Sequence, residues 1–342
     1  MNIKDLVKKY DPQNQFDVLI NSWQQIEFAL NNHYDLEGLV NQSYSNIILT
    51  GLGGSAISGD LLKNYLGNEI KVPFIVNRNY SLPGFANEKT LLIASSYSGN
   101  TEETLSVLND AIIRKCSVIV LTTGGKAEKT ARENSIPVIK LKQGYQPRYA
   151  LGMSFFSLMI ALEKIGIIPH QNEIEIILNL WKAKGKEYTE DGNLAFGLAE
   201  SLLGFTPVIY SIADLTSSAG YRFKCQLNEN SKLHAFHNEI PEMNHNEIIS
   251  WETYSDKSFP VKVVNLLDDQ CHTQIKKRFA FLNEIFSQNK IDVINLKSNE
   301  NHFKVRLMDL IYLCDWITFY IAVQRGFDPS EIDNINQLKD RL

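Results

Sequence analysis

Cysteine is scarce in this sequence, and the few cysteines present lie far apart. The 342 residues contain four, Cys116, Cys225, Cys271 and Cys314, and no two of them form a C-x-x-C pair. Disulfide frameworks and thiolate zinc sites both depend on closely or regularly spaced cysteines. We therefore expect reduced thiols, with neither a disulfide framework nor a cysteine-bound zinc.

Long apolar runs and an excess of basic charge are missing as well. No uninterrupted apolar run approaches the roughly 18 residues of a membrane span, and residues 1–6 lack the apolar core of a secretory signal. The 34 basic and 39 acidic side chains leave a net charge of −5, whereas a nucleic-acid surface usually needs a basic stripe. We expect a cytoplasmic α/β protein of roughly two domains, with no nucleic-acid partner and no membrane.

Short apolar runs alternate with helical patterns along most of the chain, which indicates parallel sheets covered by helices on both faces. The segment 151–168 is predicted to be a buried helix, and the charged stretch 185–192 a linker. The domains expected are a helical N-terminal segment, a first α/β domain, and a second α/β domain with C-terminal helices and tail, at 1–40, 41–168 and 190–342. Strands are predicted at 46–50, 72–76, 90–95, 117–122, 136–140, 207–213, 260–267 and 292–296.

A glycine-rich loop, Gly51-Leu-Gly-Gly-Ser-Ala, follows the first predicted strand and opens a helix. It fits the G-x-G-x-x-A form of a dinucleotide loop, which also needs an acidic residue after the second strand to hold a ribose. That strand ends without an acid, although Arg78 could meet an NADP phosphate instead. A tight turn with close helix–strand packing is the purely structural alternative.

A second loop, residues 95–104, reads Ser-Ser-Tyr-Ser-Gly-Asn-Thr-Glu-Glu-Thr where a strand passes into a helix. The N–H groups and dipole of a helix N-terminus attract an anion, and hydroxyls donate to phosphate oxygens without adding charge. A sugar phosphate would need such a hydroxyl cluster, whereas a dinucleotide would not. Ordinary N-capping by Ser98 or Thr101 explains one hydroxyl but not the cluster.

Polar residues of the second half could move protons. Glu229 stands between two asparagines near a predicted helix end, as a general base could, and His245 lies between two asparagines as a possible proton shuttle. A polar helix end and a solvated loop are the plain alternatives. A metal site from His234, His237 and His245 matches no compact zinc spacing. Arg148, after Pro147, could direct a fixed positive charge into a cleft or lie on the surface.

Together these motifs resemble one family. The two loops resemble the sugar isomerase (SIS) domain. The motifs Gln146-Pro-Arg148, Asn228-Glu-Asn230, Pro241-Glu-Met-Asn-His-Asn-Glu247 and the tail from Phe327 to Lys339 narrow the similarity. Over about residues 40–342 the chain is similar to the bifunctional phosphoglucose/phosphomannose isomerases of the phosphoglucose isomerase superfamily.

The resemblance implies an α/β fold of two SIS-type αβα sandwich domains with parallel central sheets. It also implies a homodimer in the cytoplasm, with active sites at the subunit boundary, no metal, no cofactor, and a place in glycolysis and gluconeogenesis. It makes Glu229 the base, Arg148 the stabiliser of the intermediate, His245 the ring-opening residue in the partner's site, and Lys339 its helper.

The same resemblance gives the substrate-binding residues. Gly53 and Gly54 would let the backbone approach the substrate. The family often has Thr-Pro where this chain has Ser330-Glu331, so Ser330 becomes the counterpart that shapes the room around C2. The hydroxyls implied to hold the phosphate are those of Ser55, Ser96, Ser98 and Thr101.

Three other functions stay open on the sequence alone. Another SIS enzyme, such as an amino-sugar phosphate isomerase or deaminase, would share the phosphate loop. A sugar-phosphate sensor would bind without turnover, but it usually carries a DNA-binding module and would not need Glu229 together with His245. An NADP oxidoreductase would use the glycine loop and leave the hydroxyl cluster without a role.

Overall fold

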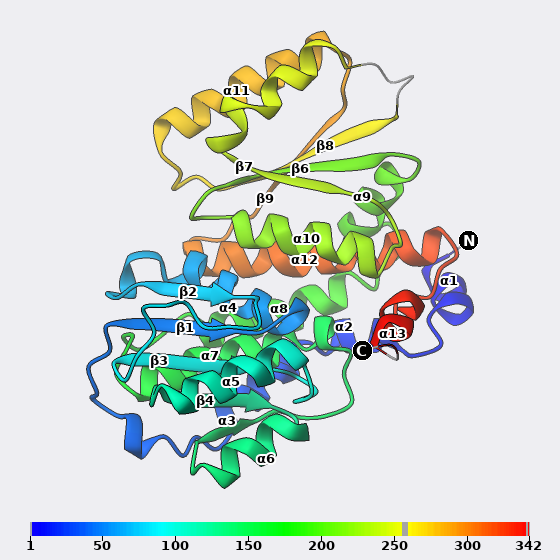
Figure 1. Cartoon of the computed structure of the whole chain (residues 1–342). Coiled ribbons are helices and arrows are strands. Elements are labelled where there is room, and N and C mark those ends of the chain that lie inside the picture. The colour runs from blue at the N-terminus through cyan, green and yellow to red at the C-terminus, as the bar shows by residue number, and fades with distance from the viewer. Residues whose placement is uncertain (1, 255–258, 340, 342) are drawn as a thin grey trace. The chain divides into compact units, whose positions relative to one another are not determined.

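The computed structural model describes residues 2–254, 259–339 and 341, and the fold is α/β with two separate parallel sheets (Figure 1). Packing divides the chain into two compact units, residues 22–178 and residues 1–21 with 179–342. The prediction of an α/β protein with parallel central sheets is confirmed. The domain limits 1–40, 41–168 and 190–342 stay a prediction.

The unit of residues 22–178 is built on a five-stranded sheet in the order β2-β1-β3-β4-β5, with every neighbouring pair parallel. Its strands are β1 (Asn46–Thr50), β2 (Phe74–Asn77), β3 (Thr90–Ser95), β4 (Ser117–Thr122) and β5 (Val138–Lys140). Its helices are α3 (Trp23–Asn31), α4 (Gly53–Leu66), α5 (Glu102–Ile113), α6 (Gly125–Glu133) and α7 (Leu151–Lys164), with short 3-10 turns η1 (Glu37–Leu39), η2 (Gly67–Glu69) and η3 (Pro147–Tyr149).

Helices cover both faces of this sheet, which explains why its strands read as continuous apolar runs. On one face, Leu92 and Val120 of the strands pack in one buried cluster with Val107 of α5 and Ala131 of α6. On the other face α4 lies so close that a Cβ at Gly59 would sit 2.9 Å from a methyl carbon of Val76. Glycine at that position therefore permits the close helix–sheet packing.

The other unit has a four-stranded parallel sheet in the order β7-β6-β8-β9. Its strands are β6 (Thr206–Ile212), β7 (Phe236–Ile240), β8 (Val261–Leu267) and β9 (Val293–Lys297). Its helices are α1 (Ile3–Tyr10), α2 (Gln15–Ile20), α9 (Leu194–Leu202), α10 (Ser217–Glu229), α11 (Thr273–Gln288), α12 (Phe303–Gln324) and α13 (Asp333–Lys339), with 3-10 turns η4 (Glu242–His245) and η5 (Glu247–Glu252). Helix α8 (Ile174–Glu187) spans the point of division.

Two layers of helices enclose this second sheet as well. Figure 1 shows α11 on one side of the strands and α10 with α12 on the other. Tyr210 of β6 belongs to the buried cluster that Phe286 of α11 completes, whereas the next residue, Ser211, faces α10 at Gly220. The alternation along β6 therefore assigns the two faces to different helices.

Helix α12 is the one helix, in the described part of the chain, that is long and apolar enough to span a membrane. However, 89% of its most apolar window is buried inside the protein. It also carries Asp315 and Arg306, which form buried ion pairs with Arg222 and Asp268. A buried core helix can have the length and apolar composition of a membrane span. The packing of α12 inside this unit therefore explains its apolar sequence.

Two segments differ from the sequence prediction. The stretch 185–192 is not a linker in its first part, because α8 continues to Glu187 and Gly185 packs so tightly that a Cβ there would lie 2.6 Å from the Ile20 carbonyl oxygen. The polar stretch after α10 contains strand β7, although a solvated loop was the plain alternative expected from the sequence. As an edge strand, β7 can carry polar side chains that a central strand would bury.

Residues 2–21 pack with the second unit through contacts distant in sequence. The Tyr312 hydroxyl of α12 donates to the Leu19 carbonyl oxygen at 2.6 Å. The Phe16 ring meets the Trp316 ring edge-on, with 5.5 Å between the ring centroids. These contacts attach α2 to α12, while α3 belongs to the other unit.

Candidate active site

The two loops that the sequence singles out meet at the centre of the first sheet. From β1 the chain crosses to β2 on one side, while β3 pairs with the other side of β1 and continues to β4. Such a reversal of strand order leaves a crevice outside the carboxyl ends of the two central strands, where ligands bind in open α/β sheets. The glycine loop follows β1 and the hydroxyl loop follows β3, so both lie at this reversal of strand order.

Hydrogen bonds that involve hydroxyls order the hydroxyl loop and link it to the glycine loop. The Ser96 and Thr101 hydroxyl oxygens lie 2.9 Å apart, and the Gly99 N–H donates to the Ser96 hydroxyl at 3.1 Å. The Ser55 hydroxyl accepts a bond from the Tyr97 N–H at 3.1 Å. The glycine loop and the hydroxyl loop therefore form one structured unit.

The N-terminus of α5 is not capped by the residues that the capping alternative named. Thr101 is the N-cap residue, yet its side chain accepts no bond from the helix N–H groups in the described structure. The Ser98 hydroxyl accepts from the Asn100 N–H at 3.2 Å, ahead of the helix. The first N–H groups of α5, with the positive end of the helix dipole, therefore remain suited to an anion.

Gly53 and Gly54 serve the backbone of this loop in two ways. Gly53 has φ +52°, a left-handed conformation that favours glycine. A Cβ at Gly54 would lie 2.8 Å from the Pro147 carbonyl oxygen and 3.2 Å from the Arg148 nitrogen. The close approach that requires glycine at position 54 is thus to the segment that carries Arg148.

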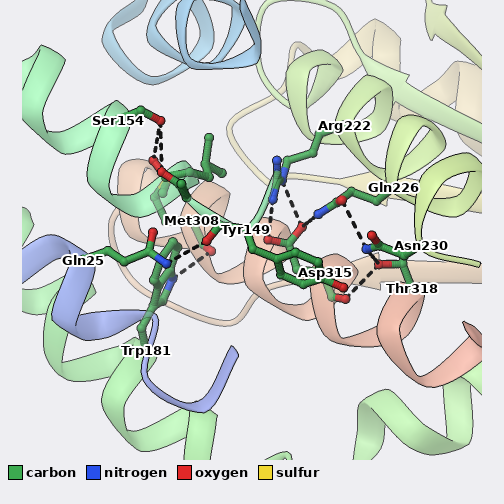
Figure 2. A network of polar contacts seen from close by, with 12 residues as sticks. Gln25, Tyr149, Ser154, Trp181, Arg222, Gln226, Asn230, Met308, Asp315 and Thr318 are labelled. Atoms are coloured by element: carbon green, nitrogen blue, oxygen red, sulfur yellow. Dashed lines mark hydrogen bonds and ion pairs between the residues drawn. The ribbon is translucent and has the colours of Figure 1, made fainter. Parts of the chain in front are cut away.

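Arg148 is buried, with 4% of its surface exposed, so the surface alternative for this residue is wrong. Its segment is held by Gln25 of α3, whose amide N–H donates to the Tyr149 carbonyl oxygen at 2.7 Å (Figure 2). The Gln25 side-chain oxygen accepts from the Met153 N–H at 3.2 Å. Gln25 was not among the residues predicted from the sequence. The feature that could have identified it is a polar residue next to Ile26 on the buried face of an amphipathic helix.

Glu229 is the last residue of α10 and is half-buried. The next residue, Asn230, is fully buried, and its amide N–H group donates to the Gln226 side-chain oxygen at 3.2 Å and to the Thr318 hydroxyl at 3.0 Å. Gln226 in turn donates to Asp315 at 2.8 Å. This network, shown in Figure 2, fastens the end of α10 to α12 and so fixes the backbone from which Glu229 projects.

The C-terminal tail begins beside the end of α10. The Lys232 ammonium donates to the Asp328 carbonyl oxygen, and the Ser330 N–H donates to the Asp328 carboxylate at 2.7 Å. Ser330 is buried, with 1% exposed. Lys339, by contrast, is exposed at the end of α13.

His245 lies away from Glu229 within the same chain. Glu229 precedes the amino end of β7 on the face covered by α10, whereas His245 follows the carboxyl end of that strand. Met243, in the same turn as His245, is buried in the cluster on the α11 face. Five residues of strand span about 16 Å. One chain therefore does not bring these two side chains together.

The other two histidines form no metal site with His245. The His237 ring lies 2.7 Å from the Ser211 hydroxyl, and burial lowers the pKa of His237 to about 4. His234 is exposed. Among the described residues, no group of three or more His, Cys, Asp or Glu side chains is arranged to hold a metal ion.

Arg78, the residue considered for an NADP phosphate, forms an ion pair with Asp60 of α4. Its guanidinium is therefore engaged by a carboxylate of the same chain.

Ser98→Ala is expected to weaken binding of inorganic phosphate and of sugar phosphates alike. Losing a hydrogen bond to a charged group costs about 1.5–3 kcal/mol, which is roughly 10–150-fold in affinity. Inhibition constants for phosphate measure this. Ser106→Ala is the matched control, because the Ser106 hydroxyl, on α5 itself, donates to the Tyr80 carbonyl oxygen. Equal inhibition of Ser98→Ala and wild type would place the anion elsewhere.

Comparison with known proteins identifies a matching family model and several similar proteins. Residues 191–342 match the family model described as the bacterial phospho-glucose isomerase C-terminal SIS domain. The chain is 38% identical over 306 residues to the bifunctional phosphoglucose/phosphomannose isomerase of Caldicellulosiruptor bescii, covering 88% of this chain and 90% of that one. It is 33% identical over 304 residues to the protein of the same name from Aquifex aeolicus, covering 87% and 91%.

Solved structures show the same fold at low sequence identity. The C-terminal domain of glucosamine-fructose-6-phosphate aminotransferase from Francisella tularensis matches with a TM-score of 0.69 at 17% identity, covering 93% of this chain and 96% of that one. The tagatose-6-phosphate ketose/aldose isomerase from Escherichia coli matches with a TM-score of 0.68 at 16% identity, covering 92% of each. With the family model, these matches confirm the predicted SIS-type fold.

Proposed function

Because the chain belongs to the family of bifunctional phosphoglucose/phosphomannose isomerases, we propose that it converts glucose 6-phosphate and mannose 6-phosphate to fructose 6-phosphate. The observation that carries the proposal in this chain is the hydroxyl loop at the strand reversal between β1 and β3, which leads into the N-terminus of α5. That arrangement suits the phosphate dianion of a sugar phosphate.

The phosphate is held by hydroxyl and backbone donors. Ser55, Ser96, Ser98 and Thr101 supply the hydroxyls, and the first turn of α5 supplies N–H groups. The hydroxyls of Ser96 and Thr101, which lie 2.9 Å apart, can rotate to donate to phosphate oxygens when the anion binds.

Isomerisation begins with ring opening. His245, helped by Lys339, transfers a proton from the C1 hydroxyl to the ring oxygen, which breaks the C1–O5 bond and leaves an aldehyde. Glu229 then removes the C2 proton, and the C2–H electron pair forms the C1–C2 double bond of a cis-enediolate. The proton of the C2 hydroxyl then passes to the negative C1 oxygen, and the C2 carbonyl forms as the C1–C2 double bond takes the proton back from the carboxyl at C1, which gives the ketose.

Arg148 offsets the negative charge that develops on the enediolate oxygen. A buried, fixed cation is effective here because charge stabilisation is strong where water is excluded. The enediolate is planar at C2, so the glucose and mannose epimers share one intermediate. Ser330, small and buried, leaves the room around C2 that accepting both epimers requires.

A homodimer with His245 contributed across the interface completes this mechanism. Glu229 ends α10, which precedes β7, whereas His245 follows the carboxyl end of β7 in a turn whose Met243 is buried in the cluster on the α11 face. A substrate that meets both residues therefore draws His245 from a second copy. We place the enzyme in the cytoplasm, in glycolysis and gluconeogenesis, as a reduced-thiol protein acting on phosphorylated sugars.

The test of the function is a direct assay of the purified protein. Fructose 6-phosphate should form from both glucose 6-phosphate and mannose 6-phosphate. A sensor would bind these sugar phosphates without turnover, and a deaminase would release ammonia from glucosamine 6-phosphate instead. Either of those outcomes would replace the proposal.

Turnover is expected to persist in EDTA, because the steps above use side chains of the protein and hydroxyls of the substrate, with no metal ion. The measurement is the rate of fructose 6-phosphate formation from mannose 6-phosphate before and after dialysis against chelator. Complete loss of activity that zinc restores would contradict the enediolate mechanism as written.

A further inference from the structure

The loop that carries His245 is anchored on both sides of that residue. Met243, two residues before it, is fully buried, and Trp251, six residues after it, is 5% exposed. Between them His245 is exposed, and its imidazole takes part in no hydrogen bond within the part of the chain described. The loop is thus held by its neighbours while the histidine ring is left available.

The polar anchor of this loop is Glu247. Its carboxylate accepts a hydrogen bond from the Tyr210 hydroxyl at 2.6 Å and another from the Asn238 amide at 2.7 Å. Tyr210 on β6 and Asn238 on β7 are direct partners in the parallel register. Two adjacent strands therefore present two donors to the two oxygens of one carboxylate, two residues from His245.

Tyr210 is itself fixed. It is fully buried, its ring stacks on Phe286 of α11, and its hydroxyl accepts a bond from the Trp251 indole N–H at 2.9 Å. Burial and the neighbouring Glu247 carboxylate both raise the pKa of Tyr210, so the hydroxyl stays protonated and donates. The hydrogen bonds to Glu247 thus tie the loop to fixed side chains of the sheet.

We propose that Glu247, held by Tyr210 and Asn238, is a positioning residue that sets the place of His245 for ring opening. The inference rests on the proposed function, in which His245 moves the proton between the C1 hydroxyl and the ring oxygen. Such a group must lie within hydrogen-bond reach of the atoms it serves. A misplacement of about 1 Å can cost about 100-fold in rate.

Ring opening can be measured apart from isomerisation as the interconversion of the two anomers of glucose 6-phosphate. Magnetisation-exchange NMR measures this rate over the spontaneous one. The full-length protein carrying Glu229→Gln is used, so that the aldehyde is not consumed. In this background Tyr210→Phe and Glu247→Ala should each slow catalysed anomerisation by about tenfold or more.

Control variants separate positioning from folding. Glu247→Gln keeps an acceptor for Tyr210, and its amide can donate to the Asn238 side-chain oxygen, so it should restore anomerisation to within about threefold. Glu252→Ala, an exposed carboxylate of the same loop, should leave the rate unchanged. The dissociation constant for fructose 6-phosphate should change by less than about twofold in Tyr210→Phe, which shows that the variant is folded.

The outcomes distinguish the inference from the function it rests on. If His245→Ala does not slow anomerisation, the ring-opening role assigned to His245 fails, and the inference fails with it. If His245→Ala slows anomerisation while the folded Tyr210→Phe and Glu247→Ala variants match the Glu229→Gln parent, the positioning role alone is overturned.

Discussion

Glu229→Gln is expected to lower the turnover of glucose 6-phosphate and mannose 6-phosphate together, by about 10²–10⁴-fold. Glutamine keeps the shape of the side chain and part of its hydrogen bonding but cannot accept the C2 proton. Both rates fall because both epimers pass through one enediolate. The two turnover rates of the purified variant measure the effect.

The fold should survive this change. The end of α10 is held by Asn230, Gln226 and the buried network to α12, and those residues are untouched. The unfolding midpoint and the affinity for sugar phosphate should therefore change little. Glu284→Gln, an exposed glutamate on α11, is the matched control and should be fully active. Near-wild-type rates in folded Glu229→Gln would falsify its role as the base, and loss of one activity alone would mean that the two epimers use different bases.

Arg148→Met is expected to lower kcat by about 10²–10³-fold for both substrates, the usual effect of removing one group that stabilises a developing oxyanion. Methionine fills much of the buried volume but carries no charge. Inhibition by inorganic phosphate should be nearly unchanged, because the phosphate is assigned to the α5 N-terminus. The measurement compares the change in kcat with the change in the inhibition constant for phosphate.

Two further variants locate the cause of that loss. Arg148→Lys keeps the charge without the planar fork of the guanidinium, so its kcat should lie between those of wild type and Arg148→Met. Arg132→Met removes an exposed arginine of α6 and should leave kcat unchanged. Equal loss of kcat and of phosphate affinity in Arg148→Met would reassign the arginine to the phosphate.

The sequence by itself determined the fold class and the positions of most strands. Parallel strands buried on both faces appear as continuous apolar runs, and the predicted strands 46–50, 90–95 and 117–122 coincide with β1, β3 and β4. It also identified the hydroxyl loop, because a cluster of hydroxyls between a strand and a helix is a local pattern. The roles of individual site residues stay predictions until the variants are measured.

Tertiary structure alone decided which of these segments meet. The order β2-β1-β3-β4-β5 brings the two loops together at the strand reversal, and no local pattern encodes strand order. Strand β7 was not predicted because its polar side chains, at the edge of a sheet, give no apolar run. Gln25 contacts the Tyr149 carbonyl oxygen across 124 positions of sequence. Glu247 was visible only as one polar residue among several in a loop.

The physical reason for this difference is the distance along the sequence over which each interaction acts. Apolar periodicity and turn chemistry act over a few residues, so they are legible in the chain itself. A buried polar group needs a hydrogen-bond partner, because leaving it unpaired costs free energy. That partner can lie anywhere in the sequence, so the residues next to either group do not reveal the pair. Arg148 and Glu229 could thus be named from motifs, but the residues that hold their segments emerged only once the chain had packed.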